Sequence, residues 1–151
     1  VDLARNDLSR SCKNVEVTKL KELQFFSHVI HMVSKVEGLI SKDASPESLL
    51  QSSFPAGTLS GAPKIKALEL IQKYESNKRN FYGGAIGCYT FSGDINHAII
   101  IRSLLAKNKT LTYQAGAGVV AKSNPQSELN EIDNKINAVR RAISNASNLS
   151  S

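Results

Sequence analysis

The sequence is poor in cysteine and has no long apolar run. Its two cysteines, Cys12 and Cys88, are too few for a disulfide framework or a cysteine-based zinc site. We therefore expect free thiols and a cytoplasmic protein. No stretch is long and apolar enough to predict a membrane span, and none has the pattern of a signal peptide.

Internal repeats, low-complexity tracts and domain linkers are also missing. The 151 residues, 41% of them hydrophobic, suffice for one core, so residues 1–151 are expected to form part of a single domain. The first residue is a valine inside an apparent helix (residues 1–8), with no capping residue before it. We therefore expect the chain to be a piece of a longer one.

The net charge is +6, from 19 Lys and Arg against 13 Asp and Glu. This excess favours either simple solubility or an anionic partner, and a small carboxylate substrate would suit it. The basic residues are scattered, without an arginine-rich helix or interleaved exposed aromatic residues. A non-catalytic, basic nucleic-acid-binding module is therefore only a distant alternative, which salt-sensitive binding would reveal.

Apolar periodicity predicts a mixture of strands and helices. Strands are expected at residues 14–26, 29–36, 82–91, 95–106 and 110–115, and helices at residues 1–8, from Ser45, at residues 63–74 and from Pro125. The last three strands are joined by short turns, which imply an antiparallel meander. The sequence therefore predicts an α+β fold, with antiparallel sheet layers covered by helices.

A small-residue loop at residues 54–64 leads into one of these helices. Free N–H groups at a helix N-terminus could bind an anion there. The loop is not a Walker P-loop, because the lysine and Ser/Thr spacing differs. An ordinary connecting loop is the alternative.

The longest predicted helix follows a glycine turn. Gly116 and Gly118 end a strand, and the helix opens at Pro125, with Ser123 and Gln126 as an expected capping box. Its apolar residues recur at three- and four-residue steps, and they are Leu129, Ile132, Ile136, Val139 and Ile143.

Three charged residues, Glu128, Glu131 and Lys135, form a stripe beside that apolar face. Most such stripes are solvated surface that contributes little to stability. Beside a glycine turn, however, two carboxylates and an ammonium could hold a divalent cation and an anionic ligand together. We adopt this as the starting hypothesis for function.

Arg102 and His31 are further candidates. Arg102 is expected within the strand at residues 95–106, where both faces are apolar, and a covered arginine needs an anion such as a substrate carboxylate. His31 lies among apolar neighbours, as core histidines often do. Its functional alternative is a neutral imidazole that lines a pocket and moves a proton near neutral pH.

Seven segments in the same order resemble the chorismate-utilising enzymes, and most of all the large subunits (component I) of anthranilate synthases. They are residues 1–8 (VDLARNDL), 31–38 (HMVSKVEG), 57–64 (GTLSGAPK), 82–87 (YGGAIG), 101–103 (IRS), 114–118 (QAGAG) and the set Glu128, Glu131, Asn134 and Lys135. The resemblance covers nearly the whole chain, and it implies a fragment of the sandwich fold of these enzymes.

What the resemblance implies is Mg²⁺-dependent conversion of chorismate and ammonia to anthranilate and pyruvate, in tryptophan biosynthesis. The ammonia would come from a partner glutamine amidotransferase or from solution. Glu131 matches a direct metal ligand, and Glu128 matches a nearby outer carboxylate. Oxygen donors with retained waters are what Mg²⁺ prefers.

The remaining matches concern the substrate. Arg102 and Tyr82 match residues that bind the enolpyruvyl carboxylate, and backbone N–H groups around Gly116 and Gly118 match the same pocket. Lys135 matches a lysine that adds positive charge beside the substrate carboxylates.

Two residues nearer the N-terminus match groups at the substrate ring. Thr58 matches a pocket residue near the ring, and His31 matches the histidine that assists proton movement around the leaving 4-hydroxyl. Metal-binding carboxylates of the family would precede Val1, so this chain alone is expected to be inactive and to bind Mg²⁺ poorly.

The close alternative is component I of aminodeoxychorismate synthase, which delivers the amine to ring carbon 4. The amino-acid sequences of residues 57–60 and 127–131 favour anthranilate synthase. Isochorismate and salicylate synthases fit less well at residues 61–64.

Overall fold

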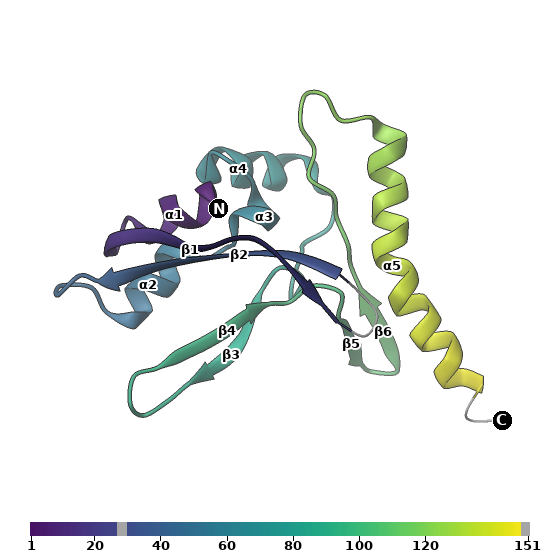
Figure 1. Ribbon diagram of the computed structural model, residues 1–151. Coiled ribbons are helices and arrows are strands. Elements are labelled where there is room, and N and C mark those ends of the chain that lie inside the picture. Colours follow the sequence, from purple (N-terminus) through teal and green to yellow (C-terminus); the bar gives the residue numbers. More distant parts are fainter. Residues whose placement is uncertain (27–29, 149–151) are drawn as a thin grey trace. The chain divides into compact units, whose positions relative to one another are not determined.

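Figure 1 shows the computed structural model, which describes residues 1–26 and 30–148. Val29, in one of the expected strands, lies outside the described residues. The chain divides into two compact units. The first contains Val1–Ala67 and Tyr89–Ile95, and the second contains Leu68–Cys88 and Asn96–Ser151.

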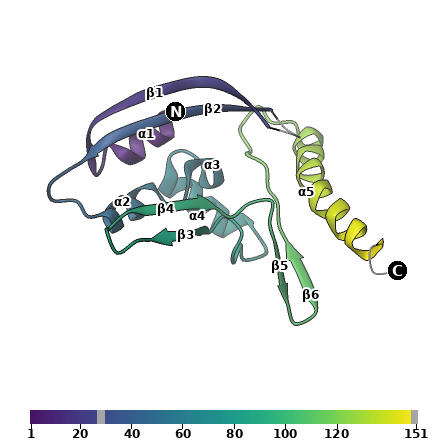
Figure 2. The same ribbon diagram turned by 60° about the horizontal axis from the view of Figure 1, so that its bottom comes forward.

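A long two-stranded ribbon dominates the first unit (Figure 1). It consists of β1 (Cys12–Phe25) and β2 (Ile30–Ile40), which pair antiparallel. Helix α1 (Asp2–Leu8) contacts both strands and also α2 (Pro46–Ser53), as Figure 2 shows from another side. Ser45 caps α2, because its side chain accepts a hydrogen bond from the N–H of Ser48 at 3.2 Å. Both expected strands and this helix are therefore confirmed.

The small-residue loop is more regular than the sequence indicates. Residues Gly57–Ser60 form a short helix, α3, because the N–H groups of Leu59 and Ser60 donate to the carbonyl of Ala56. The expected helix follows as α4 (Lys64–Tyr74). Several N–H groups of the loop are thus used inside α3 rather than left for an anion.

A buried ion pair ties α1 to the start of α4. Lys64 Nζ lies 2.9 Å from Asp7 Oδ1, and both side chains are largely buried, with exposed fractions of 12% and 9%. The same ammonium approaches the carbonyl oxygens of Ser52 and Ser53 at 3.5 and 3.4 Å, near the end of α2. Lys64 therefore connects three helices of the first unit.

The β-rich block consists of two hairpins. Strand β3 (Ala85–Tyr89) pairs with β4 (Ile95–Ile99), and β5 (Leu104–Lys107) pairs antiparallel with β6 (Thr110–Tyr113). The expected turns at residues 92–94 and 107–109 are confirmed. Asn108 and Lys109 have φ values of 50° and 60°, as both central residues of a type I′ hairpin turn require.

The single strand expected at residues 95–106 is wrong. The extended structure is interrupted between β4 and β5, where Arg102 has a φ of 51°. The N–H and C=O of Ile100 bond to the backbone of Gly84 and Gly83 at 2.8 Å, and the strand does not continue past that point. The expected meander is therefore replaced by separate two-stranded sheets, although the α+β class is confirmed.

The chain ends in α5 (Pro125–Asn148), the longest helix of the described residues. The expected capping box is wrong by one residue. Asn124 is the cap, since its Oδ1 accepts a hydrogen bond from the N–H of Ser127 at 3.1 Å. On the apolar face Val139 is buried, whereas Leu129 is 50% exposed.

Few side chains of the described residues are buried. The buried hydrophobic residues are Cys12, Tyr82 and Val139, and Asp7 is buried as well. Polar contacts therefore carry much of the local geometry. None of the described helices combines the length and apolar composition that crossing a bilayer requires.

Replacing Lys64 with methionine is expected to lower the free energy of unfolding by about 3 kcal/mol, because Asp7 would keep an unpaired charge in a buried place. Adding Asp7→Leu should recover most of that loss, since both charges are then absent. The control is Lys35→Met, which removes an exposed ion pair of 2.7 Å with Glu37 and should cost about 0.5 kcal/mol or less. Chemical denaturation measures all four proteins, and equal losses for both single lysine variants would contradict the expectation.

Candidate functional site

Lys135 joins α5 to the irregular segment around Gly116 and Gly118 in the second unit, for which we keep the name glycine turn. Its Nζ donates a hydrogen bond to the carbonyl of Gly116 at 2.9 Å and forms an ion pair with Glu131 Oε1 at 2.6 Å. The Lys135 side chain is 31% exposed, and that of Glu131 is 53% exposed. Because one ammonium contacts both groups, it fixes the carboxylate relative to the backbone of the turn.

Tyr82 approaches the same turn from another segment. It is buried, with 9% of its surface exposed. An ideal Cβ placed on Gly116 would lie 3.3 Å from the Tyr82 hydroxyl oxygen, so glycine is needed for this close approach. Among the described residues the hydroxyl has no hydrogen-bond partner, and it can therefore bond to a ligand. We call Tyr82, Gly116, Glu131 and Lys135 the glycine-turn cluster.

Two further predicted residues, Glu128 and Gly118, lie near members of this cluster in the chain. Glu128 lies one helical turn before Glu131 and is partly buried, and within the described part of the chain its carboxylate has no ion pair or hydrogen bond. A Cβ on Gly118 would meet no heavy atom within 4 Å. The backbone on that side of the turn is therefore open to a ligand.

Arg102 differs from expectation. It is exposed rather than covered, and it occupies the break between two strands instead of a strand face. The backbone bonds of Ile100 to Gly83 and Gly84 bring the Arg102 segment beside the residues that follow Tyr82. Considering only the residues described, its guanidinium forms no ion pair and remains available to an anion.

His31 and Thr58 belong to the first unit, whereas the seven other predicted residues belong to the second. His31 is exposed on β2, where its ring packs edge-on against Phe26 with centroids 5.6 Å apart. The expectation of a histidine enclosed by apolar neighbours is thus wrong. Thr58 is exposed on α3. The roles of these two residues stay predictions.

Glu128 and Glu131 are the two carboxylates that the sequence predicts to hold a metal ion. Within the described residues no group of three or more His, Cys, Asp or Glu side chains is arranged to hold a metal ion. Glu131 and Glu128 nevertheless offer hard oxygen donors from one face of α5, which suits an ion that takes its other ligands from water and substrate. The pair therefore fits part of a magnesium coordination sphere.

Sequence reasoning missed two charged residues near the cluster. Glu75 and Arg79 pair through Arg79 Nη2 and Glu75 Oε1 at 2.6 Å, and the guanidinium lies over the Tyr82 ring. Their i, i+4 spacing just before Tyr82 was the available signal.

Comparisons with known proteins show the family of the chain. The sequence profile of the chorismate binding enzymes matches residues 1–141. Anthranilate synthase component 1 of Neisseria gonorrhoeae is 49% identical over 144 residues, which cover 94% of this chain and 29% of that protein. The corresponding protein of Mycobacterium tuberculosis is 46% identical over 151 residues, covering 99% of this chain and 29% of that one.

Solved structures give the same result. The crystal structure of anthranilate synthase component I from Streptococcus pneumoniae matches with a TM-score of 0.82 and 43% identity, over 89% of this chain and 31% of that one. A Bacillus anthracis protein, described as a 2,3-dihydroxybenzoate-specific isochorismate synthase, matches with a TM-score of 0.82 and 29% identity, over 95% and 39%. The chain thus spans less than a third of the length of the curated relatives named above. On the profile match and these identities, the chain belongs to the family of chorismate binding enzymes.

Proposed function

We propose that this chain forms the chorismate-binding catalytic part of an anthranilate synthase component I. The reaction converts chorismate and ammonia to anthranilate, pyruvate and water. The proposal is supported by the curated relatives, which carry that name at 46–49% identity. It is also supported by the site, whose chemistry suits a substrate with two carboxylates.

The glycine-turn cluster is the observation that carries the proposal. It combines a partly buried ammonium, the hydroxyl of a buried tyrosine that has no hydrogen-bond partner among the described residues, and a glycine backbone that a ligand can approach. Lys135 and Arg102 supply positive charge for carboxylates, and the Tyr82 hydroxyl can donate a directional hydrogen bond. Dianionic chorismate presents groups that match these donors.

The chemistry assigns separate tasks to the remaining residues. Ammonia attacks ring carbon 2 while the 4-hydroxyl leaves as water, and pyruvate is then eliminated as the ring becomes aromatic. His31 is proposed to give the leaving hydroxyl its proton, and Thr58 is proposed to contact the ring. Lys135 and the N–H groups around Gly118 hold the carboxylates, which keeps the ring fixed during both steps.

Glu131 and Glu128 are proposed to hold Mg²⁺, Glu131 directly and Glu128 through the outer shell. When bound, the ion supplies positive charge next to a substrate carboxylate. Glu131 pairs with Lys135 at 2.6 Å, so the carboxylate proposed for the metal and the ammonium proposed for the substrate are neighbours on α5. Ammonia is proposed to come from a glutamine amidotransferase partner or from solution.

The natural protein, with any segments it has beyond these residues, is expected to form anthranilate from chorismate, ammonium and Mg²⁺. Fluorescence and product chromatography measure this. Formation of aminodeoxychorismate or isochorismate instead would assign one of the related activities and contradict the proposal.

Glu131→Gln should lower kcat/KM for chorismate by at least about 100-fold, because the variant loses a metal carboxylate. The control is Asp133→Asn on the same helix, where an exposed carboxylate lies 3.8 Å from Arg140. That variant should keep the wild-type rate. A Glu131→Gln protein with wild-type rate and Mg²⁺ dependence would remove Glu131 from the metal site.

Alanine at either glycine of the turn should weaken chorismate binding for different reasons. Gly116→Ala forces the Tyr82 hydroxyl to move, since the new methyl group would lie 3.3 Å from it. Gly118→Ala meets no atom within 4 Å, so the free energy of unfolding should change by less than about 0.5 kcal/mol. Its KM should nevertheless rise, because the methyl group occupies the path of the ligand. An unchanged KM for Gly118→Ala would place the substrate elsewhere.

A further inference from the structure

A two-pronged ion pair precedes Tyr82 in the chain. Arg79 Nε donates to Glu75 Oε2 at 2.9 Å, and Arg79 Nη2 donates to Glu75 Oε1 at 2.6 Å. The hydrogen bond from Arg79 lowers the pKa of Glu75 from its ordinary value, so this carboxylate stays charged at neutral pH. Pairing through two nitrogens fixes the plane of the guanidinium as well as its position.

The fixed guanidinium lies on the Tyr82 ring. Its central carbon is 5.8 Å from the ring centroid, within the range of cation–π attraction. The N–H of Tyr82 also donates to the carbonyl of Arg79 at 2.9 Å. Arg79 thus holds the residue through both its backbone and its ring.

At its other end, Tyr82 has a functional group without a partner in the described residues. Its hydroxyl lies beside Gly116, whose carbonyl is held by Lys135. The Arg79 guanidinium therefore contacts one face of the ring, while the ring's hydroxyl lies beside the glycine turn. Only 9% of Tyr82 is exposed, and its hydroxyl oxygen lies 3.3 Å from the position of a Cβ on Gly116. A shift of the ring would therefore move the hydroxyl relative to the turn.

We propose that Arg79, held by Glu75, is a positioning residue that aligns the Tyr82 hydroxyl for a carboxylate of the substrate. Arg79 itself does not touch the substrate, because its charge is engaged by Glu75 and by the ring. The activity readout of this inference rests on the function proposed above. The ordinary alternative is that the ion pair only stabilises the turn between α4 and Tyr82.

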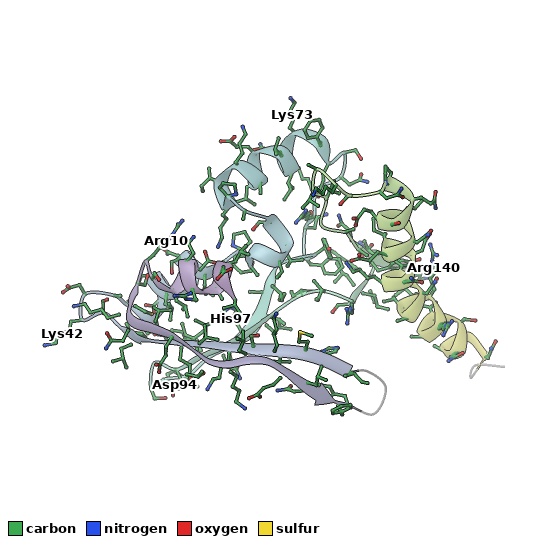
Figure 3. All side chains as sticks on the ribbon, turned by 45° about the horizontal axis from the view of Figure 1, so that its top comes forward. Arg10, Lys42, Lys73, Asp94, His97 and Arg140 are labelled. Carbon is green, nitrogen blue, oxygen red and sulfur yellow. The ribbon has the colours of Figure 1, made fainter. Side chains whose placement is uncertain are left out.

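The chain offers a matched control on the same segment. Lys73 Nζ lies 5.1 Å from the ring centroid of Tyr74, which is the same type of contact. Tyr74 is 72% exposed, and Figure 3 shows Lys73 pointing outward from α4. Lys73→Met therefore removes a cation–π contact that has no connection to the glycine-turn cluster.

A double-mutant cycle in the natural protein separates the two roles. Arg79→Met should raise the KM for chorismate about fivefold, the size expected from one cation–π contact, with little change in kcat. Arg79→Met combined with Tyr82→Phe should be no worse than Tyr82→Phe alone, because the hydroxyl that Arg79 aligns is already absent. Arg79→Lys should recover part of the KM, and Lys73→Met should not change it. Additive effects of Arg79→Met and Tyr82→Phe would overturn the proposal.

A second readout does not depend on catalysis. In the natural protein labelled with 3-fluorotyrosine, fluorine NMR reports on individual tyrosines, four of which lie in these residues, and Tyr82→Phe identifies the signal from Tyr82 by its disappearance. Glu75→Gln and Arg79→Met should both shift or broaden that signal, whereas Lys73→Met should leave it unchanged. An unmoved Tyr82 signal in both variants would overturn the proposal. If the wild-type protein makes no anthranilate, the proposed function fails while this measurement still decides the role of Arg79.

Discussion

The position of the Lys135 ammonium between a carboxylate and a backbone carbonyl is the contact on which the candidate site depends. Few hydrophobic side chains of the described residues are buried, so packing alone does not fix the glycine turn against α5. The contacts of 2.6 and 2.9 Å do so instead. Because charge-assisted hydrogen bonds are directional, they set the place of Glu131 relative to Gly116, and hence relative to Tyr82.

Local signals were sufficient for most of the helices and strands. Ser45 before Pro46 predicted the start of α2, and Pro125 predicted the start of α5, since proline favours the first helical position. The same preference also locates the N-cap of α5, which lies one residue later than expected. With Pro125 as the first helical residue, the cap must be Asn124, not Ser123.

Non-local hydrogen bonds explain what the sequence could not show. Apolar residues occur on both faces of the expected strand through residues 95–106, so the sequence pattern gives no sign that the strand stops. The pairing extends to Ile100, which bonds to the backbone of Gly83 and Gly84 some sixteen residues earlier in the chain, and the strand is then interrupted where Arg102 takes a positive φ. The stripe of Glu128, Glu131 and Lys135 was visible in the sequence. The contact of Lys135 with Gly116, however, exists only in the folded chain.

The groups of the second unit divide into those that are already paired and those that are not. Lys135 and Glu131 neutralise each other, whereas the Tyr82 hydroxyl and Arg102 have no partner among the residues described here. The Tyr82 hydroxyl can donate a hydrogen bond to a ligand that accepts one, and the Arg102 guanidinium can pair with an anion. In the proposed function, the contacts of Lys135 fix the backbone at Gly116, and the Tyr82 hydroxyl and Arg102 are donors still available to the substrate. A carboxylate can accept a hydrogen bond from the hydroxyl or pair with the guanidinium, while a neutral ligand of similar shape would leave the guanidinium without a counter-charge.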